Sequence, residues 1–163
     1  MFRTGNGFDV HRFAAEGREG ASITLGGVKI PHTHVLLAHS DGDVLVHALC
    51  DALLGALAFG DIGQHFPDTD PQYKDIDSLG LLDRVYTLIS DAGWFLNNAD
   101  ITVIAEAPRL SEHKQAMREV LAATLDESMD KISIKATTSE GLGFTGRGEG
   151  IAVMVSVLLQ EQS

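Results

Sequence analysis

Short apolar segments, either alternating or continuous, predict several β-strands in this chain. Residues 23–30 predict a hairpin, because Gly26 and Gly27 supply a two-residue turn between two β-forming segments. The other predicted strands cover residues 2–10, 99–105, 132–136 and 151–159. The last of these is apolar on both faces, which is typical of a central strand or of a strand at a subunit interface.

Longer segments predict helices. Residues 43–59 are apolar nearly all round, so this helix should be buried on most sides, with Ser40 or Asp41 as its N-cap. Two further helices are predicted over residues 78–92 and 111–125.

The segment between the first two helices, residues 60–77, lacks periodicity and is rich in Gly, Pro and Asp, so it predicts a long loop. No repeat or linker divides the chain, and its 163 residues predict a single domain spanning residues 1–163. Together these elements predict an α+β fold, a two-layer sandwich in which helices cover one face of a mixed β-sheet.

An excess of acidic residues limits the partners of this chain. Its formal net charge is −11, from 12 Lys+Arg and 23 Asp+Glu, which argues against nonspecific binding to nucleic acid or to anionic membranes. A phosphorylated ligand would need positive charge from metal ions, backbone amides and helix N-termini. The start of the sequence does not resemble a signal peptide, and the single cysteine suits a reducing compartment, so we expect a cytoplasmic protein.

Three residues carry the strongest chemical signal. Asp9 and His11 have strand spacing, so both side chains leave the backbone on the same face, and His47 lies in an apolar segment where an imidazole needs a partner. One carboxylate and two imidazoles without a fourth protein ligand are typical of a catalytic zinc site with an open position. At this point an unrelated Asp-x-His pair and a buried core histidine explain the same residues equally well.

Asp51 lies four residues after His47 and therefore on the same helix face. It could fix the tautomer of the imidazole, as carboxylates beside metal-binding histidines often do. It could equally serve an unrelated hydrogen bond.

Two loops concentrate polar groups. Residues 60–70 contain four titratable side chains, and residues 135–140 end in three hydroxyls and a carboxylate, followed by a glycine-rich segment to residue 150. Clustered glycines and hydroxyls let backbone amides approach phosphate oxygens, although such a segment is often only a loop. Glu140 could complete a magnesium site together with substrate phosphates.

Five segments together resemble the 2-C-methyl-D-erythritol 2,4-cyclodiphosphate synthase family. They are residues 8–11 (FDVH), 39–49 (HSDGDVLVHAL), 60–70 (GDIGQHFPDTD), 135–138 (KATT) and 143–150 (GFTGRGEG). The resemblance extends over essentially the whole chain in the order and spacing of the family. It therefore favours the zinc interpretation over an unrelated pair of motifs.

The resemblance implies a homotrimeric phosphorus–oxygen lyase of the non-mevalonate isoprenoid pathway, with sheets packed around a three-fold axis and active sites between adjacent subunits. Such an enzyme converts 4-diphosphocytidyl-2-C-methyl-D-erythritol 2-phosphate into the cyclic diphosphate and CMP. Attack of the 2-phosphate on the β-phosphorus is intramolecular, so positioning and charge neutralisation supply the catalysis. The implied cofactors are one Zn²⁺ per subunit and Mg²⁺ or Mn²⁺ bridging the diphosphate, and an isoprenoid diphosphate could occupy a central cavity.

Residue by residue, the resemblance assigns zinc to Asp9, His11 and His47 and magnesium to Glu140. It assigns transition-state stabilisation to His39 and Thr138, and the cytidine diphosphate to residues 105–111 and 137–140. The implied substrate-binding residues are Asp9, His11, His39, Ser40, Asp61, Ile62, Gly63, Phe66, Pro67, Asp68, Thr69, Asp70, Ala105, Glu106, Ala107, Pro108, Arg109, Leu110, Ser111, Thr137, Thr138, Ser139, Glu140, Phe144 and Arg147.

Two positions depart from the common pattern of the family. Arg109 stands where lysine is usual, and Ser139 stands where a third threonine is frequent. Neither departure removes a metal ligand. A planar guanidinium and a compact ammonium bind phosphate differently, so the contact made at residue 109 stays open.

The strand over residues 151–159 also bears on assembly. Helices of one chain cover only one face of a sheet, so we expect the second face, including Val155, to meet a neighbouring subunit. Arg147 and Glu149 precede this strand at a spacing of two residues and are expected to meet their symmetry mates near the three-fold axis. Exposed hairpin charges of little energetic value are the alternative.

Two other functions use the same residues. A zinc phosphohydrolase would activate water at the metal, with His39 or Asp61 as the base. A non-catalytic trimeric protein would retain the metal and bind an isoprenoid diphosphate. Product analysis distinguishes both from the synthase.

Overall fold

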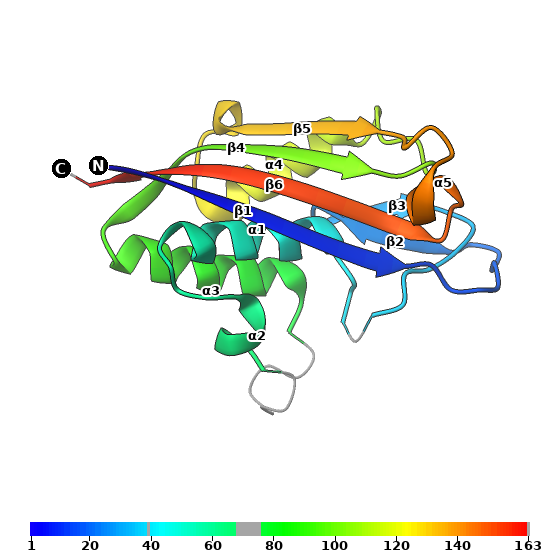
Figure 1. Ribbon diagram of the computed structural model, residues 1–163, viewed down its shortest axis with the longest axis horizontal. Helices are drawn as coiled ribbons and strands as arrows, with labels where there is room; N and C mark the ends of the chain where they lie inside the picture. The colour runs from blue at the N-terminus through cyan, green and yellow to red at the C-terminus, as the bar shows by residue number, and fades with distance from the viewer. Residues whose placement is uncertain (39, 68–75, 163) are drawn as a thin grey trace.

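A mixed four-stranded sheet and a layer of helices make up the fold (Figure 1). The computed structural model describes residues 1–38, 40–67 and 76–162. The strands are β1 (Phe2–Arg12), β2 (Ser22–Leu25), β3 (Val28–Pro31), β4 (Trp94–Ile104), β5 (Ile132–Thr137) and β6 (Gly150–Glu161). The helices are α1 (Val44–Ala56), α2 (Ile62–His65), α3 (Ser78–Asp91), α4 (Lys114–Leu125), the 3-10 turn η1 (Met129–Lys131) and α5 (Gly143–Gly146).

The main sheet has the strand order β1-β6-β4-β5, and β2 and β3 form a separate hairpin. β6 pairs antiparallel with both β1 and β4, whereas β4 and β5 are parallel. The predicted α+β class, the mixed sheet and the hairpin at Gly26 and Gly27 are therefore confirmed. Because β4 and β5 run in the same direction, the loops that follow them leave the sheet side by side.

Helix α1 lies in the centre of the core, between the sheet and α3, and most of its residues are fully buried. This explains why its sequence is apolar nearly all round. No helix in the described part of the chain is long and apolar enough to span a membrane.

Two glycines of β1 determine how closely α1 approaches the sheet. A Cβ atom on Gly5 would lie 1.9 Å from the carbonyl oxygen of Ala52, and one on Gly7 would lie 1.8 Å from that of Ala48. Both distances are far inside van der Waals contact, so only glycine fits at these positions. The strand and the helix therefore meet backbone to backbone.

The N-cap of α1 is Asp43, and the expectation that Ser40 or Asp41 would cap this helix is wrong. The Asp43 carboxylate is fully buried and accepts hydrogen bonds from the backbone N–H groups of Val46 (3.1 Å), Gly26 (2.9 Å) and Gly27 (2.7 Å). Desolvation raises the pKa of this carboxyl despite these donors. One side chain thus joins the helix start to the turn of the β2–β3 hairpin.

Three other sequence predictions need correction. The predicted loop over residues 60–77 contains the short helix α2, whose cap is Asp61. The third helix begins at Lys114, not at Ser111, because residues 111–113 form a turn without a side-chain cap. The glycine-rich segment also contains a short helix, α5.

The orientation of Val155 also differs from our expectation. Val155 is 2% exposed and belongs to the core under the helices, whereas its neighbour Met154 is 54% exposed on the opposite face. Met154 pairs with Phe8, which is also exposed, so large apolar side chains do gather on the uncovered face of the sheet. A contact with a neighbour would use Met154 rather than Val155.

We predict that Gly7→Ala destabilises the protein by about 3 kcal/mol, the upper end of the usual cost of overpacking. The obstructing atom is the backbone carbonyl oxygen of Ala48, which cannot move aside by a change of rotamer. Gly55→Ala is the matched control: it lies in α1 itself, on the exposed side, and its added Cβ would come no closer than 4.0 Å to the Asn6 carbonyl oxygen. Alanine there should stabilise by about 0.5–1 kcal/mol. Urea unfolding followed by circular dichroism measures both, and equal effects of the two changes would refute the close-contact argument.

Candidate metal centre

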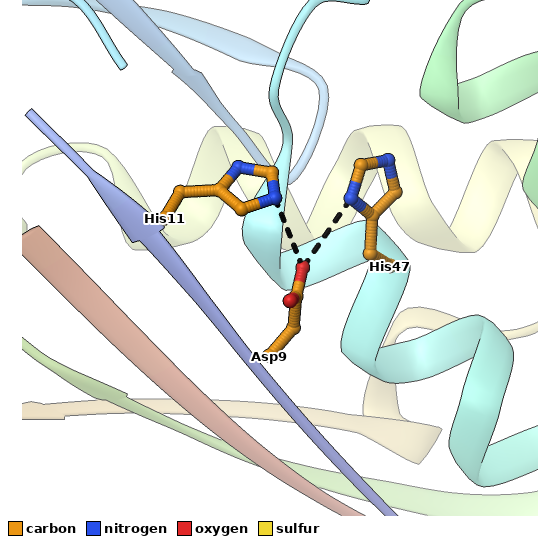
Figure 2. A group of neighbouring side chains, drawn as sticks. All are labelled: Asp9, His11 and His47. Carbon is orange, nitrogen blue, oxygen red and sulfur yellow. Dashed lines mark ion pairs between the residues drawn. The ribbon is translucent and has the colours of Figure 1, made fainter. Parts of the chain in front are cut away.

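Strand β1 and helix α1 bring three potential ligands together (Figure 2). Asp9 and His11 project from the face of β1 that is turned toward α1, and His47 projects from the first turn of the helix. The predicted strand spacing of Asp9 and His11 is therefore confirmed. Each residue offers a ligand atom, and these atoms lie within 4.8 Å of one another.

The Asp9 carboxylate lies between the two imidazoles. Its Oδ2 atom is 3.2 Å from Nε2 of His11 and 3.3 Å from Nδ1 of His47. This oxygen is buried, yet it has no hydrogen bond of normal geometry among the described residues. A buried carboxylate oxygen without a hydrogen bond, facing two ring nitrogens, suits a divalent cation.

Electrostatics within the group couple the carboxylate to the imidazoles. Burial would raise the pKa of Asp9, but the interactions with His11 and His47 outweigh it and hold that pKa far below its ordinary value. Burial would lower the pKa of His11, but Asp9, with a smaller contribution from the Gly42 carbonyl, outweighs it and raises that pKa. The group therefore carries an ionised carboxylate that attracts positive charge.

The outer nitrogens of both rings have their own partners. Nδ1 of His11 lies 2.9 Å from the carbonyl oxygen of Gly42, and Nε2 of His47 lies 3.2 Å from Oγ of Ser78. Ser78 in turn donates hydrogen bonds to the Asp41 carboxylate. Sequence reasoning missed Ser78 and Asp41, since nothing in the pattern indicates that the start of α3 meets α1 at this point.

Asp51, the predicted partner of His47, hydrogen-bonds to a different group. Its Oδ1 atom accepts a hydrogen bond of 2.9 Å from the backbone N–H of Ile62, so the alternative of an unrelated hydrogen bond is correct. This bond ties α2 to α1.

Several predicted substrate residues lie in or next to α2. Asp61 caps this helix and accepts a hydrogen bond of 3.0 Å from Gln64 N, Ile62 and Gly63 form its first turn, and Phe66 and Pro67 follow it. Ser40 is exposed, in the segment that leads to α1. Four predicted residues lie outside the described part of the chain: His39, Asp68, Thr69 and Asp70.

The predicted nucleotide-binding residues form a second group. Residues 105–111 follow β4, and residues 137–140 begin at the last residue of β5, so the parallel pairing places the two segments side by side. Glu106 links the loops, because its Oε1 atom accepts hydrogen bonds from the backbone N–H groups of Ser139 (3.2 Å) and Gly141 (3.4 Å). The backbone of Glu140 has a φ of 54°, a left-handed conformation that is costly for a residue other than glycine.

The structure does not bring this second group to the metal ligands within one chain. β1 and β5 form opposite edges of the sheet, with β6 and β4 between them. Three strand spacings amount to roughly 14 Å. A substrate that used both groups of one chain would have to cross this distance.

Phe144 and Arg147 lie near a third feature. A pocket of about 240 Å³ is lined by Phe8, Val10, His11, Arg12, Phe144, Glu149 and Gly150. Arg147 caps α5 and donates a hydrogen bond of 2.7 Å to Glu149, and both side chains are exposed. The pocket combines apolar walls with two opposite charges, those of Arg12 and Glu149.

Comparison with known proteins gives a consistent result. A family model described as the YgbB family matches residues 2–160. The chain is 61% identical over 160 residues to 2-C-methyl-D-erythritol 2,4-cyclodiphosphate synthase of Alcanivorax borkumensis, covering 98% of each chain. It is 58% identical to the synthase of Cellvibrio japonicus, again covering 98% of each chain.

Solved structures agree with the sequence relatives. A structure of 2C-methyl-D-erythritol-2,4-cyclodiphosphate synthase in a CDP-bound form matches with a TM-score of 0.87 and 37% identity, covering 97% of this chain and all of that one. The IspF–CDP complex of Plasmodium falciparum matches with a TM-score of 0.86 and 33% identity, covering 99% and 97% of the two chains. The bifunctional IspDF of Campylobacter jejuni matches with a TM-score of 0.91 and 50% identity over 99% of this chain, which spans 42% of that longer chain.

We predict that binding of a divalent metal at this centre releases a proton and strengthens as the pH rises. His11 must lose its proton to bind a metal, and its raised pKa extends this competition above the ordinary histidine value of 6.5. Calorimetric titration in two buffers of different ionisation enthalpy measures the released protons. His34→Ala, which removes a histidine outside the centre, should behave like the wild type, whereas an affinity independent of pH would contradict the raised pKa.

Proposed function

Because this chain belongs to the YgbB family, and its relatives over nearly the full length are cyclodiphosphate synthases, we propose that it converts 4-diphosphocytidyl-2-C-methyl-D-erythritol 2-phosphate into 2-C-methyl-D-erythritol 2,4-cyclodiphosphate and CMP. The chain is a lyase of the methylerythritol phosphate pathway of isoprenoid biosynthesis. The observation that carries this conclusion is the group of Asp9, His11 and His47, three potential metal ligands, in a chain that matches the family from residue 2 to residue 160. The relatives give no support to a phosphohydrolase or to a non-catalytic binding protein.

We assign one Zn²⁺ to Asp9, His11 and His47, because a borderline-soft metal suits two imidazoles and one carboxylate. When bound, the metal would supply Lewis-acid neutralisation of phosphate charge. The protein holds the ligands in place before the substrate arrives: β1 fixes two of them and α1 the third. The positive charge that an acidic chain lacks is thus provided locally.

The second group is assigned to the nucleotide end of the substrate. Thr138 donates a hydrogen bond of 3.3 Å to Glu140, so a hydroxyl and a carboxylate stand together after β5. Glu140 would hold Mg²⁺ or Mn²⁺, which would neutralise charge on the diphosphate, and Thr138 would stabilise the negative charge that develops on the phosphoryl oxygens. Residues 105–111 provide the neighbouring loop for the cytidine end.

We infer an active site between adjacent subunits, which the separation of the two groups within one chain supports. Each chain would contribute its metal ligands to one neighbour and its nucleotide loops to the other, in a homotrimer closed by the uncovered sheet faces. Phe8 and Met154 on this face support such packing. In the same assembly we assign an isoprenoid diphosphate to the pocket beside Phe144, with apolar walls for the chain, the Arg12 guanidinium for the phosphate, and the Glu149 carboxylate paired with Arg147.

The test of the activity is incubation with the substrate and divalent metal, followed by phosphorus NMR. We predict cyclic diphosphate and CMP from the wild type and background levels of both from His47→Ala, because two remaining ligands hold zinc poorly. His34→Ala is the matched control and should keep its activity and one zinc per subunit. Inorganic or linear phosphate from the wild type would instead identify a phosphohydrolase, and bound metal without CMP release a binding protein.

The test of the assembly is light scattering of single-site variants. We predict a trimer for the wild type and loss of the trimer for Met154→Glu, because the substitution places a charge in an apolar contact. Leu88→Glu is the matched control: Leu88 is 37% exposed on α3, on the helical side of the molecule. A monomeric wild type, or an intact trimer of the Met154 variant, would refute the interface.

A further inference from the structure

A buried serine connects helix α3 to one of the proposed metal ligands. Ser78 is the first residue of α3 and is only 1% exposed. Its Oγ atom lies 3.2 Å from Nε2 of His47 and also donates to Oδ1 of Asp41, while its backbone N–H donates to Oδ2 of Asp41 at 3.1 Å. Three segments of the chain therefore meet at one hydroxyl.

The direction of these hydrogen bonds follows from which groups can donate. An ionised carboxylate only accepts, so the single proton of the Ser78 hydroxyl is directed to Asp41. The Ser78 oxygen can then only accept from His47, which requires the proton of a neutral imidazole to sit on Nε2. Nδ1, the nitrogen that faces Asp9, is thereby left with a free lone pair.

His11 is oriented by the same segment of the chain. Its Nδ1 atom lies 2.9 Å from the carbonyl oxygen of Gly42, which can only accept, so the proton sits on Nδ1 and Nε2 is free to face Asp9. Asp41 and Gly42 are adjacent in sequence, and the next residue, Asp43, caps α1. Residues 41–43 thus fix the tautomer of one ligand directly, that of the other through Ser78, and the start of the helix that carries it.

We propose that Ser78, held by Asp41, is a positioning residue that keeps Nδ1 of His47 unprotonated and directed at the metal. The proposal deepens the assigned metal centre and rests on it. Residues 41–43 would then have two roles: they start α1, and they fix the tautomers of both histidine ligands. The same segment lies beside Ser40, one of the predicted substrate contacts. A shift of this segment would alter the metal centre.

A carboxylate at residue 41 is needed for this arrangement. Its two oxygens receive donors from the Ser78 hydroxyl, the Ser78 backbone N–H and, at 3.4 Å, the backbone N–H of Asp43. An asparagine would present an NH₂ group to at least one of these donors. Asp41→Asn should therefore loosen Ser78 without changing the size of the side chain.

The test combines nitrogen NMR of the histidine rings with metal affinity, in the full-length protein at a pH where the imidazoles are neutral. In the metal-free wild type we expect the proton of His47 on Nε2; in Ser78→Ala and Asp41→Asn we expect both tautomers. Zn²⁺ affinity, measured by competition with a chelator, should fall about 10–100-fold in the alanine variant. Ser90→Ala, an exposed serine of the same helix, is the control and should match the wild type.

The outcomes separate this proposal from the metal assignment itself. A wild type that binds no Zn²⁺ would overturn the assigned centre. A wild type that binds Zn²⁺, together with Ser78 and Asp41 variants that keep the Nε2 tautomer and full affinity, would overturn only the role of Ser78. If Ser78→Ala does not fold, the tautomer and affinity of Asp41→Asn decide the proposal alone.

Discussion

The backbone of strand β1 lies directly against the backbone of helix α1, because Gly5 and Gly7 leave no side chain between them. Asp9 follows Gly7 on the same face of the strand, and His47 precedes Ala48 in the helix. Any larger residue at the two glycine positions would move the helix outward and separate the carboxylate from the imidazole. The contact that packs the core is thus also the contact that assembles the metal centre.

Burial at this contact gives the centre its electrostatic character. The Oδ2 atom of Asp9 is buried, and although two ring nitrogens lie 3.2 and 3.3 Å from it, neither forms a hydrogen bond of normal geometry with it. A desolvated anion of this kind favours a cation strongly. A metal ion bound here would give a chain with a formal net charge of −11 the positive charge that a substrate with several phosphates needs, at a single point and without basic side chains.

The strand order adds a second constraint. The parallel pair β4 and β5 places two polar loops together, and the order β1-β6-β4-β5 holds them at the far edge from the metal ligands. The metal ligands come from β1 and α1, and the nucleotide loops follow β4 and β5, so the two halves of the proposed chemistry lie at opposite edges of the sheet. Joining them through a neighbouring subunit, as we propose, would use the same uncovered sheet face that carries Phe8 and Met154.

The sequence by itself determined the fold class and most elements. The strand spacing of Asp9 and His11 and the apolar segment around His47 are local properties that made these residues ligand candidates, and the family motifs then favoured them over unrelated roles. The sequence could not determine whether Ser40, Asp41 or Asp43 caps α1, because the position of Asp43 is fixed by hydrogen bonds to the β2–β3 turn as well as to the helix. It also could not identify Ser78, because the contact with His47 depends on how α3 packs against α1. Nor could it show that Val155 points inward and Met154 outward, because that depends on which face of the sheet the helices cover. Such contacts join residues distant in sequence, and only tertiary packing decides them.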